Sequence, residues 1–123
     1  MRATILIVDD NVQLRAFIRE IVAEASALHV VGEATDGVEA MRLVQALRPA
    51  IVLLDLVMPR VNGLEVLRWI KVERPGIKVI IVTVHADDAY RQAAEASGAD
   101  AFLLKKTLGT ALLPTIRRLY GCR

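Results

Sequence analysis

The chain has 123 residues, a little under the length of one average domain, and we expect a single compact unit over residues 1–123. Hydrophobic residues make up 54% and the mean hydropathy is +0.42, which excludes intrinsic disorder and leaves ample material for a core. The net charge of +2 is spread along the chain, and the longest apolar run, residues 50–54, falls far short of the roughly 18 residues of a membrane span, so no membrane helix is expected.

Short apolar runs alternate with longer amphipathic stretches five times along the chain. The runs predict strands over residues 3–8, 28–34, 50–54, 77–83 and 101–104. Asn11 is the predicted N-cap of the first helix, and Asp36 opens a second helix that Pro49 stops. The third helix ends before Pro75, and Asp87 or Asp88 caps a fourth, alanine-rich helix.

The last helix is expected to start near Thr110, which would leave Pro114 at the limit of its first turn; an earlier start would place a kink at this proline. Trp69 lies between the core positions of the third helix and is interpreted as a partly exposed packing residue. Alternating strands and helices predict an α/β fold, (βα)5, with a doubly wound parallel sheet and helices on both faces.

Polar residues follow four of the predicted strands: Asp9 and Asp10, Asp55, Thr83, and Lys105. Taken singly, each has an ordinary role in a cap, a turn, a strand or an exposed surface. The carboxyl ends of parallel strands share one rim, however, and three carboxylates there repel one another unless a cation lies among them. Such oxygen ligands suit Mg²⁺, and a lysine and a hydroxyl beside them would complete a phosphate site.

The same segments resemble the receiver domains of two-component response regulators, and the resemblance spans the whole chain. The motifs that carry it are Ile5-Leu6-Ile7-Val8-Asp9-Asp10, Val52-Leu53-Leu54-Asp55-Leu56-Val57-Met58-Pro59 with Asn62-Gly63, Ile81-Val82-Thr83, and Phe102-Leu103-Leu104-Lys105. The resemblance implies a CheY-like, flavodoxin-like sheet with strand order 2-1-3-4-5.

The family also implies roles for individual residues. Asp55 matches the phosphoacceptor, which would take a phosphoryl group from a sensor histidine kinase, a phosphotransfer protein or a small acyl phosphate. Asp10, Asp55 and the backbone carbonyl of Val57 match direct Mg²⁺ ligands, while Asp9 matches a carboxylate that holds the metal through water. A receiver is not an enzyme, because it assists only its own phosphorylation and dephosphorylation.

The remaining matched residues belong to the switch. Lys105 matches the phosphate-binding lysine, Thr83 the hydroxyl that moves towards the phosphoryl group, and Phe102 the aromatic residue that follows it. The face formed by the fourth helix, the fifth strand and the fifth helix would then be read by an output partner or by a second copy. Leu113 and Tyr120 are expected to make that face apolar.

Two positions, those of Lys106 and Val84, depart from the family pattern. Lys106 stands where family members commonly carry proline in a cis peptide. The Phe-Leu-Leu-Lys sequence without this proline resembles receivers that precede helix-turn-helix output domains, so the chain is either such a receiver or a stand-alone regulator. Val84 replaces a usual alanine or glycine, and we hypothesise that it narrows access to the site. Val57 and His85 flank the path of the attacking water, and His85 is expected to be an exposed loop residue.

Two alternatives stay open. One is a receiver-like docking module that works without phosphorylation; the other is a Mg²⁺-dependent aspartyl-phosphate phosphatase of the haloacid-dehalogenase type, whose nucleophile follows the first strand in an Asp-x-Asp pattern. No helix-turn-helix segment supports direct binding of nucleic acid by this chain. The chain shows no cleavable signal peptide, and its single Cys122 cannot form an internal disulfide, so a cytoplasmic location is expected.

Overall fold

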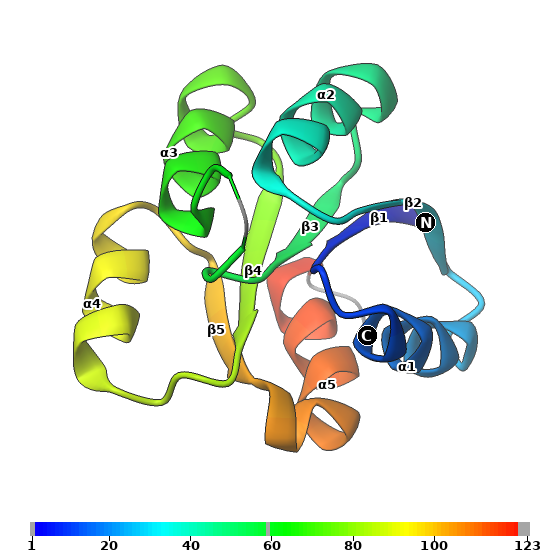
Figure 1. Cartoon of the computed structure of the whole chain (residues 1–123). Coiled ribbons are helices and arrows are strands. Elements are labelled where there is room, and N and C mark those ends of the chain that lie inside the picture. Colours follow the sequence, from blue (N-terminus) through cyan, green and yellow to red (C-terminus); the bar gives the residue numbers. More distant parts are fainter. Residues whose placement is uncertain (1, 59, 121–123) are drawn as a thin grey trace.

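A computed structural model, which describes residues 2–58 and 60–120, shows a five-stranded parallel sheet in the order β2-β1-β3-β4-β5 (Figure 1). The strands are β1 (Ala3–Val8), β2 (Leu28–Ala34), β3 (Ile51–Leu54), β4 (Lys78–Thr83) and β5 (Ala101–Leu104). The helices are α1 (Val12–Ala23), α2 (Gly37–Leu47), α3 (Gly63–Glu73), α4 (Asp88–Ala96) and α5 (Leu108–Tyr120). The predicted fold class and strand order are confirmed. Pro59 and Cys122 lie outside the described residues.

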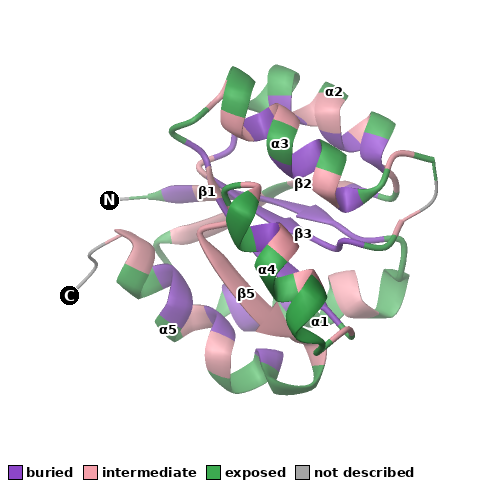
Figure 2. Ribbon diagram, turned by 90° about the vertical axis from the view of Figure 1, so that its left-hand side faces the viewer, coloured by how far each residue is buried: buried purple, intermediate pink, exposed green. Residues whose placement is uncertain are grey.

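The helices form a layer on each face of the sheet, with α2, α3 and α4 on one face and α1 and α5 on the other (Figure 1). Alternate residues of the central strands feed the two cores, since Leu53 packs towards α1 and α5 whereas Leu54 packs towards the other layer. Figure 2 shows the central strands buried and α4 largely exposed. Within α4 only Ala94 is buried, so this helix is held by few core contacts.

Most predicted caps and boundaries agree with the structure. Asn11 caps α1 by accepting from the backbone N–H groups of Gln13 and Leu14, and Asp36 caps α2 by accepting from the N–H of Glu39. Asp87 occupies the N-cap position of α4 without making a side-chain cap bond. Strands β3 and β4 each begin one residue later than predicted, at Ile51 and Lys78.

The predicted start of the last helix is wrong. A single 3-10 turn, η1 (Lys105–Thr107), follows β5 directly, and α5 begins at Leu108 rather than near Thr110. Leu108 is fully buried in the core beneath α1 and α5, which fixes the earlier start. Pro114 therefore lies inside α5, where it cannot donate to the carbonyl of Thr110.

The sequence predicts no membrane helix. Of the described helices, none combines the length and the apolar character needed to cross a bilayer.

Candidate functional site

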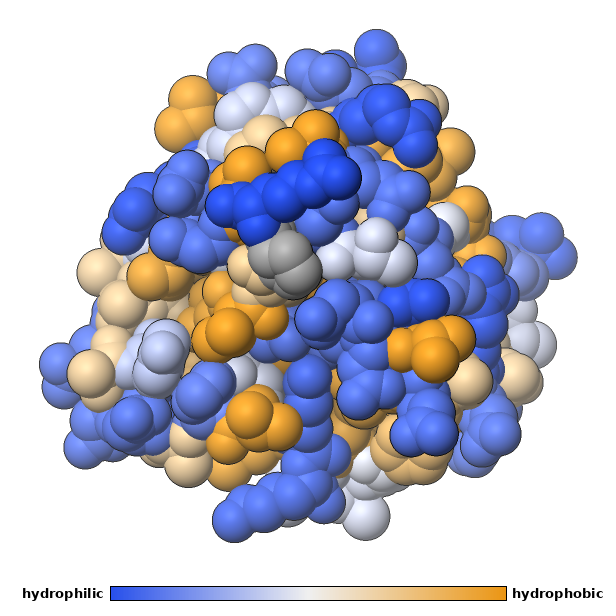
Figure 3. Space-filling model, viewed as in Figure 1, coloured by the Kyte–Doolittle hydropathy of each residue, from blue (hydrophilic) through white to orange (hydrophobic). Residues whose placement is uncertain are grey.

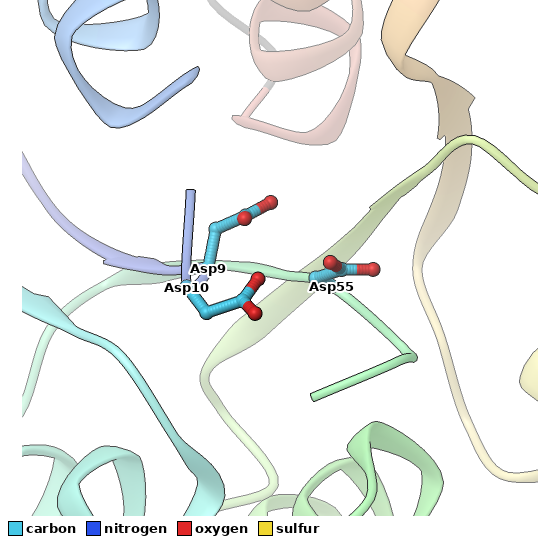
Figure 4. Close-up of side chains that lie close together, drawn as sticks. All are labelled: Asp9, Asp10 and Asp55. Carbon is cyan, nitrogen blue, oxygen red and sulfur yellow. The ribbon is translucent and has the colours of Figure 1, made fainter. Parts of the chain in front are cut away.

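Three carboxylates meet at the rim formed by the carboxyl ends of β1 and β3 (Figure 4). Asp9, Asp10 and Asp55 each present a carboxylate oxygen, and these oxygens lie within 4.8 Å of one another. Asp9 is 2% exposed and Asp55 is 6% exposed, whereas Asp10 is open to solvent. The structure thus brings together the acidic residues that the strand ends predicted.

Local hydrogen bonds hold the two buried carboxylates. The N–H of Asn11 donates to Asp9 Oδ1 over 2.8 Å, and the N–H of Val57 donates to Asp55 Oδ1 over 3.2 Å. The N–H of Asp55 itself bonds to the carbonyl of Val8 over 3.0 Å, which ties the end of β3 to β1. The second oxygen of each carboxylate, Oδ2, contacts a residue on the other side of the rim.

Lys105 is that residue. Its Nζ lies 2.9 Å from Asp9 Oδ2 and 3.3 Å from Asp55 Oδ2, and its side chain is 18% exposed. Burial by itself lowers the pKa of Lys105, but the hydrogen bond to Asp9 and the negative charges of Asp55 and Asp9 outweigh it and raise the pKa above its ordinary value. Lys105 therefore stays charged at neutral pH.

Burial, followed by the negative charge of Asp9, raises the pKa of Asp55, although Lys105 and the Val57 N–H oppose the shift. One ammonium cannot balance three carboxylates at this distance, so the site has an excess of negative charge. Clustered carboxylate oxygens are the ligands of hard divalent cations, and the residues present fit such an ion.

Of the predicted switch residues, Thr83 lies at the same rim, whereas Phe102 lies two residues before the end of β5. Thr83 ends β4, is fully buried, and accepts from the N–H of His85 through Oγ1 over 3.2 Å. Phe102 lies on β5, where the guanidinium carbon of Arg91 sits 4.6 Å from the ring centroid. The coordinating role of the Val57 carbonyl stays a prediction.

The positions that depart from the family pattern surround the same rim. Val84 is 67% exposed and, with Ala86, Leu104, Lys105 and Lys106, lines a hollow of about 280 Å³. His85 is only half-buried rather than freely exposed, because its ring stacks on Tyr90 at a centroid distance of 4.7 Å. His85 lies in the loop between β4 and α4 as predicted, but the expectation that its side chain is exposed to solvent is wrong.

The expectation of an apolar surface over α4, β5 and α5 is wrong. No large hydrophobic side chain is exposed among the described residues of α4, β5 and α5. A hollow of about 230 Å³ there has a mixed lining, with the charged Arg91, Glu95, Asp100 and Arg118 beside Ala99, Ala101, Phe102 and Leu103. Leu113 instead lines a separate hollow with Ala25 and Leu28, and the Tyr120 hydroxyl donates to the carbonyl of Ala50 over 2.7 Å. On the face seen in Figure 3, hydrophobic side chains form separate patches among hydrophilic ones.

Sequence reasoning missed one residue of the site. Arg15 Nη1 donates to the backbone carbonyl of Asp9 over 2.7 Å, and Arg15 Nε donates to Glu33 Oε1 over 2.6 Å. The helical pattern places Arg15 beside a core position, but nothing in the local sequence indicates which carbonyl its side chain reaches.

Comparison with known proteins agrees with this geometry. The model of the response regulator receiver domain matches residues 5–117. The chain is 33% identical over 113 residues to the transcriptional regulatory protein DegU of Brevibacillus brevis and 36% identical over 103 residues to the nitrate/nitrite response regulator protein NarL of Escherichia coli strain K12. These alignments cover 92% and 84% of this chain but 48% of each relative, so the chain spans about half their length.

A crystal structure of a LuxR-family two-component response regulator from Aurantimonas sp. SI85-9A1 superposes with a TM-score of 0.92 at 30% identity, covering 100% of this chain and 88% of that one. The family model that matches this chain is that of the receiver domain and not that of the haloacid-dehalogenase phosphatases. The chain belongs to the response regulator receiver domain family and resembles the receivers of NarL/LuxR-type two-component regulators.

Proposed function

We propose that this chain accepts a phosphoryl group on Asp55 from the phosphohistidine of a sensor histidine kinase or of a phosphotransfer protein. The observation that carries the proposal is the convergence of Asp9, Asp10, Asp55 and Lys105 at one rim. An Asp55 carboxylate oxygen would attack phosphorus, the phosphorus–nitrogen bond would break, and the neutral imidazole would leave after taking up a proton. An aspartyl phosphate would result.

The ion we propose for the acidic cluster is Mg²⁺, held by Asp10, Asp55 and the Val57 carbonyl and through water by Asp9. When bound, it would neutralise charge on the transferring phosphoryl group. Lys105, which pairs with Asp9 and Asp55, would exchange one of these contacts for a phosphoryl oxygen. The chain would assist only its own phosphorylation and dephosphorylation, and in that sense would not be an enzyme.

The phosphoryl group would bias the conformation through Thr83 and Phe102. Thr83 would leave its bond with the His85 N–H to donate to a phosphoryl oxygen. Phe102 would then repack beneath Arg91, which changes the surface of α4, β5 and α5.

We infer a transcriptional output, because the DegU and NarL relatives are twice as long as their matched part and DegU is named a transcriptional regulatory protein. A helix-turn-helix region in the same polypeptide or a separate partner would supply the output from a cytoplasmic location. Binding of nucleic acid is not assigned to this domain itself.

Pairing of two copies through α4, β5 and α5 is part of the same proposal. The hollow there carries both charge signs, so Arg91 and Arg118 of one copy could face Glu95 and Asp100 of the other about a two-fold axis. Sedimentation velocity before and after phosphorylation should show a monomer becoming a dimer that high salt dissociates. A phosphorylated protein that stays monomeric at high concentration would contradict this pairing.

Acetyl phosphate with Mg²⁺ provides the direct test of phosphorylation. Intact-mass spectrometry should show one added phosphoryl group on the native protein and none on Asp55→Asn. The control variant Asp87→Asn, which changes an exposed aspartate without a side-chain cap bond, should gain the group as the native protein does.

The second candidate function is a docking module that needs no phosphorylation, and the exposed Val84 beside the hollow near Lys105 is the observation that favours it. If the native protein gains no phosphoryl group, Val84→Ala distinguishes the two functions. A gain in that variant would indicate a site narrowed by the valine, whereas continued failure would favour the docking module.

A further inference from the structure

Asp9 and Asp10 follow β1 directly, yet both carboxylates reach one oxygen cluster with Asp55. In a regular strand, successive side chains point to opposite faces. The N–H of Asp9 still bonds to the carbonyl of Ala34 on β2 over 3.0 Å, so the chain leaves strand geometry after this group. The peptide group between Asp9 and Asp10 therefore sets how the two carboxylates lie relative to each other.

The carbonyl of that peptide group is held by Arg15 from the first turns of α1. Arg15 Nη1 donates to it over 2.7 Å, and the Arg15 side chain is 13% exposed. Arg15 is fixed in turn by Glu33 of β2, whose Oε1 accepts from Nε over 2.6 Å. A guanidinium can make both bonds at once because its donors point in fixed, separate directions.

Glu33 is ionised in this arrangement. Partial burial alone raises the pKa of Glu33, but the hydrogen bonds and charges of Arg19 and Arg15 outweigh it and hold the pKa below its ordinary value. Arg19 Nε donates to the second oxygen of Glu33, and its side chain is 49% exposed. Arg15 and Arg19 thus share one anchor, while the structure gives only Arg15 a bond to Asp9.

We propose that Arg15, held by Glu33, is a positioning residue for the cation site, because it fixes the peptide group that joins Asp9 to Asp10. The proposal rests on the proposed function in one respect, namely that Mg²⁺ binds at the acidic cluster. Without Arg15 the Asp9 carbonyl would turn to water, the two carboxylates would lose their common orientation, and Mg²⁺ would bind less tightly.

Isothermal titration of the full chain with Mg²⁺ provides the test, and Arg19→Gln is the matched control. Arg15→Gln and Arg19→Gln each remove one α1 arginine that bonds to Glu33. Only Arg15→Gln also removes the bond to the Asp9 carbonyl. We expect Arg15→Gln to raise the Kd for Mg²⁺ about tenfold and Arg19→Gln to raise it less than about twofold. Arg15→Lys, which keeps the charge but not the two divergent donors, should also weaken binding severalfold.

Urea midpoints of the variants separate positioning from stability. Similar midpoints for Arg15→Gln and Arg19→Gln with different Mg²⁺ affinities would support the proposal, and Arg15→Lys serves in the same comparison if Arg15→Gln does not fold. Equal Mg²⁺ affinities for the native protein and the Arg15 variants would overturn the inference while leaving phosphorylation of Asp55 untouched. A native protein that binds no Mg²⁺ would overturn the inference together with the metal part of the proposed function. Missing phosphorylation despite normal Mg²⁺ binding would count only against the proposed phosphorylation of Asp55 and would leave the inference about Arg15 intact.

Discussion

At the scale of single residues, Asp55 shows a conflict between stability and the proposed chemistry. Burial and the neighbouring Asp9 raise its pKa above the ordinary 3.8, so the folded protein binds the proton of this carboxyl more tightly than the unfolded chain does. Stability from this group is therefore complete below pH 3.8 and is lost as the pH rises through the folded pKa. At neutral pH without Mg²⁺, ionised Asp55 opposes folding.

The Asp55→Asn variant should accordingly have a higher urea midpoint than the native protein at pH 7 without Mg²⁺. The amide oxygen can still accept from the Val57 N–H, and Lys105 keeps its contact with Asp9. The advantage should shrink as the pH falls below the folded pKa and disappear below the ordinary value of 3.8. Asp87→Asn is the exposed control and should show no such pH-dependent gain; a lower midpoint for Asp55→Asn at pH 7 would contradict the sign argued here.

At the scale of elements, the site depends on how closely α3 approaches the end of β3. The N–H of Gly63 donates to the carbonyl of Leu56 over 2.8 Å, which closes the loop that follows Asp55. A Cβ at Gly63 would lie 2.4 Å from the Asp55 carbonyl oxygen and 2.5 Å from the Leu56 Cα. Both atoms are backbone, so neither can move aside without moving the strand end.

Gly63→Ala should therefore lower the free energy of unfolding by about 3 kcal/mol, measured by urea denaturation. Gly76→Ala is the matched control, because a Cβ there meets nothing within 4 Å; we expect it to be neutral or to stabilise by up to about 1 kcal/mol. Equal midpoints for the two variants would show that the backbone around Gly63 accommodates a Cβ without a loss of stability.

The elements also show how far the sequence reaches. Apolar runs and caps such as Asn11 predict the existence of the strands β1–β5 and the helices α1–α5, because these signals are local. The parallel topology then brings Asp9, Asp55 and Lys105 to one rim. The predicted start of α5 is wrong because the burial of Leu108 is a tertiary effect, which the residues before Thr110 do not signal locally. Likewise, the reach of the Arg15 side chain to the Asp9 carbonyl depends on a contact between elements that no local pattern records.

At the scale of the whole molecule, the two helical layers share one thin sheet. Leu53 and Leu54 are adjacent on β3 but contribute to opposite cores, and both are at most 1% exposed. Loss of packing on one face therefore displaces strands whose other side chains hold the second face. This arrangement predicts a single cooperative unfolding transition for the domain.

Leu112→Ala provides a test across the sheet. Leu112 is fully buried in the core beneath α1 and α5, whereas Trp69, the one tryptophan of the chain, packs against the opposite core. The substitution should lower the free energy of unfolding by about 3 kcal/mol. The urea transition seen by Trp69 fluorescence should shift as far as the one seen by far-ultraviolet circular dichroism. If Trp69 reported an unshifted transition while the circular dichroism midpoint fell, the two helical layers would unfold separately, and the single cooperative transition predicted for the domain would be wrong.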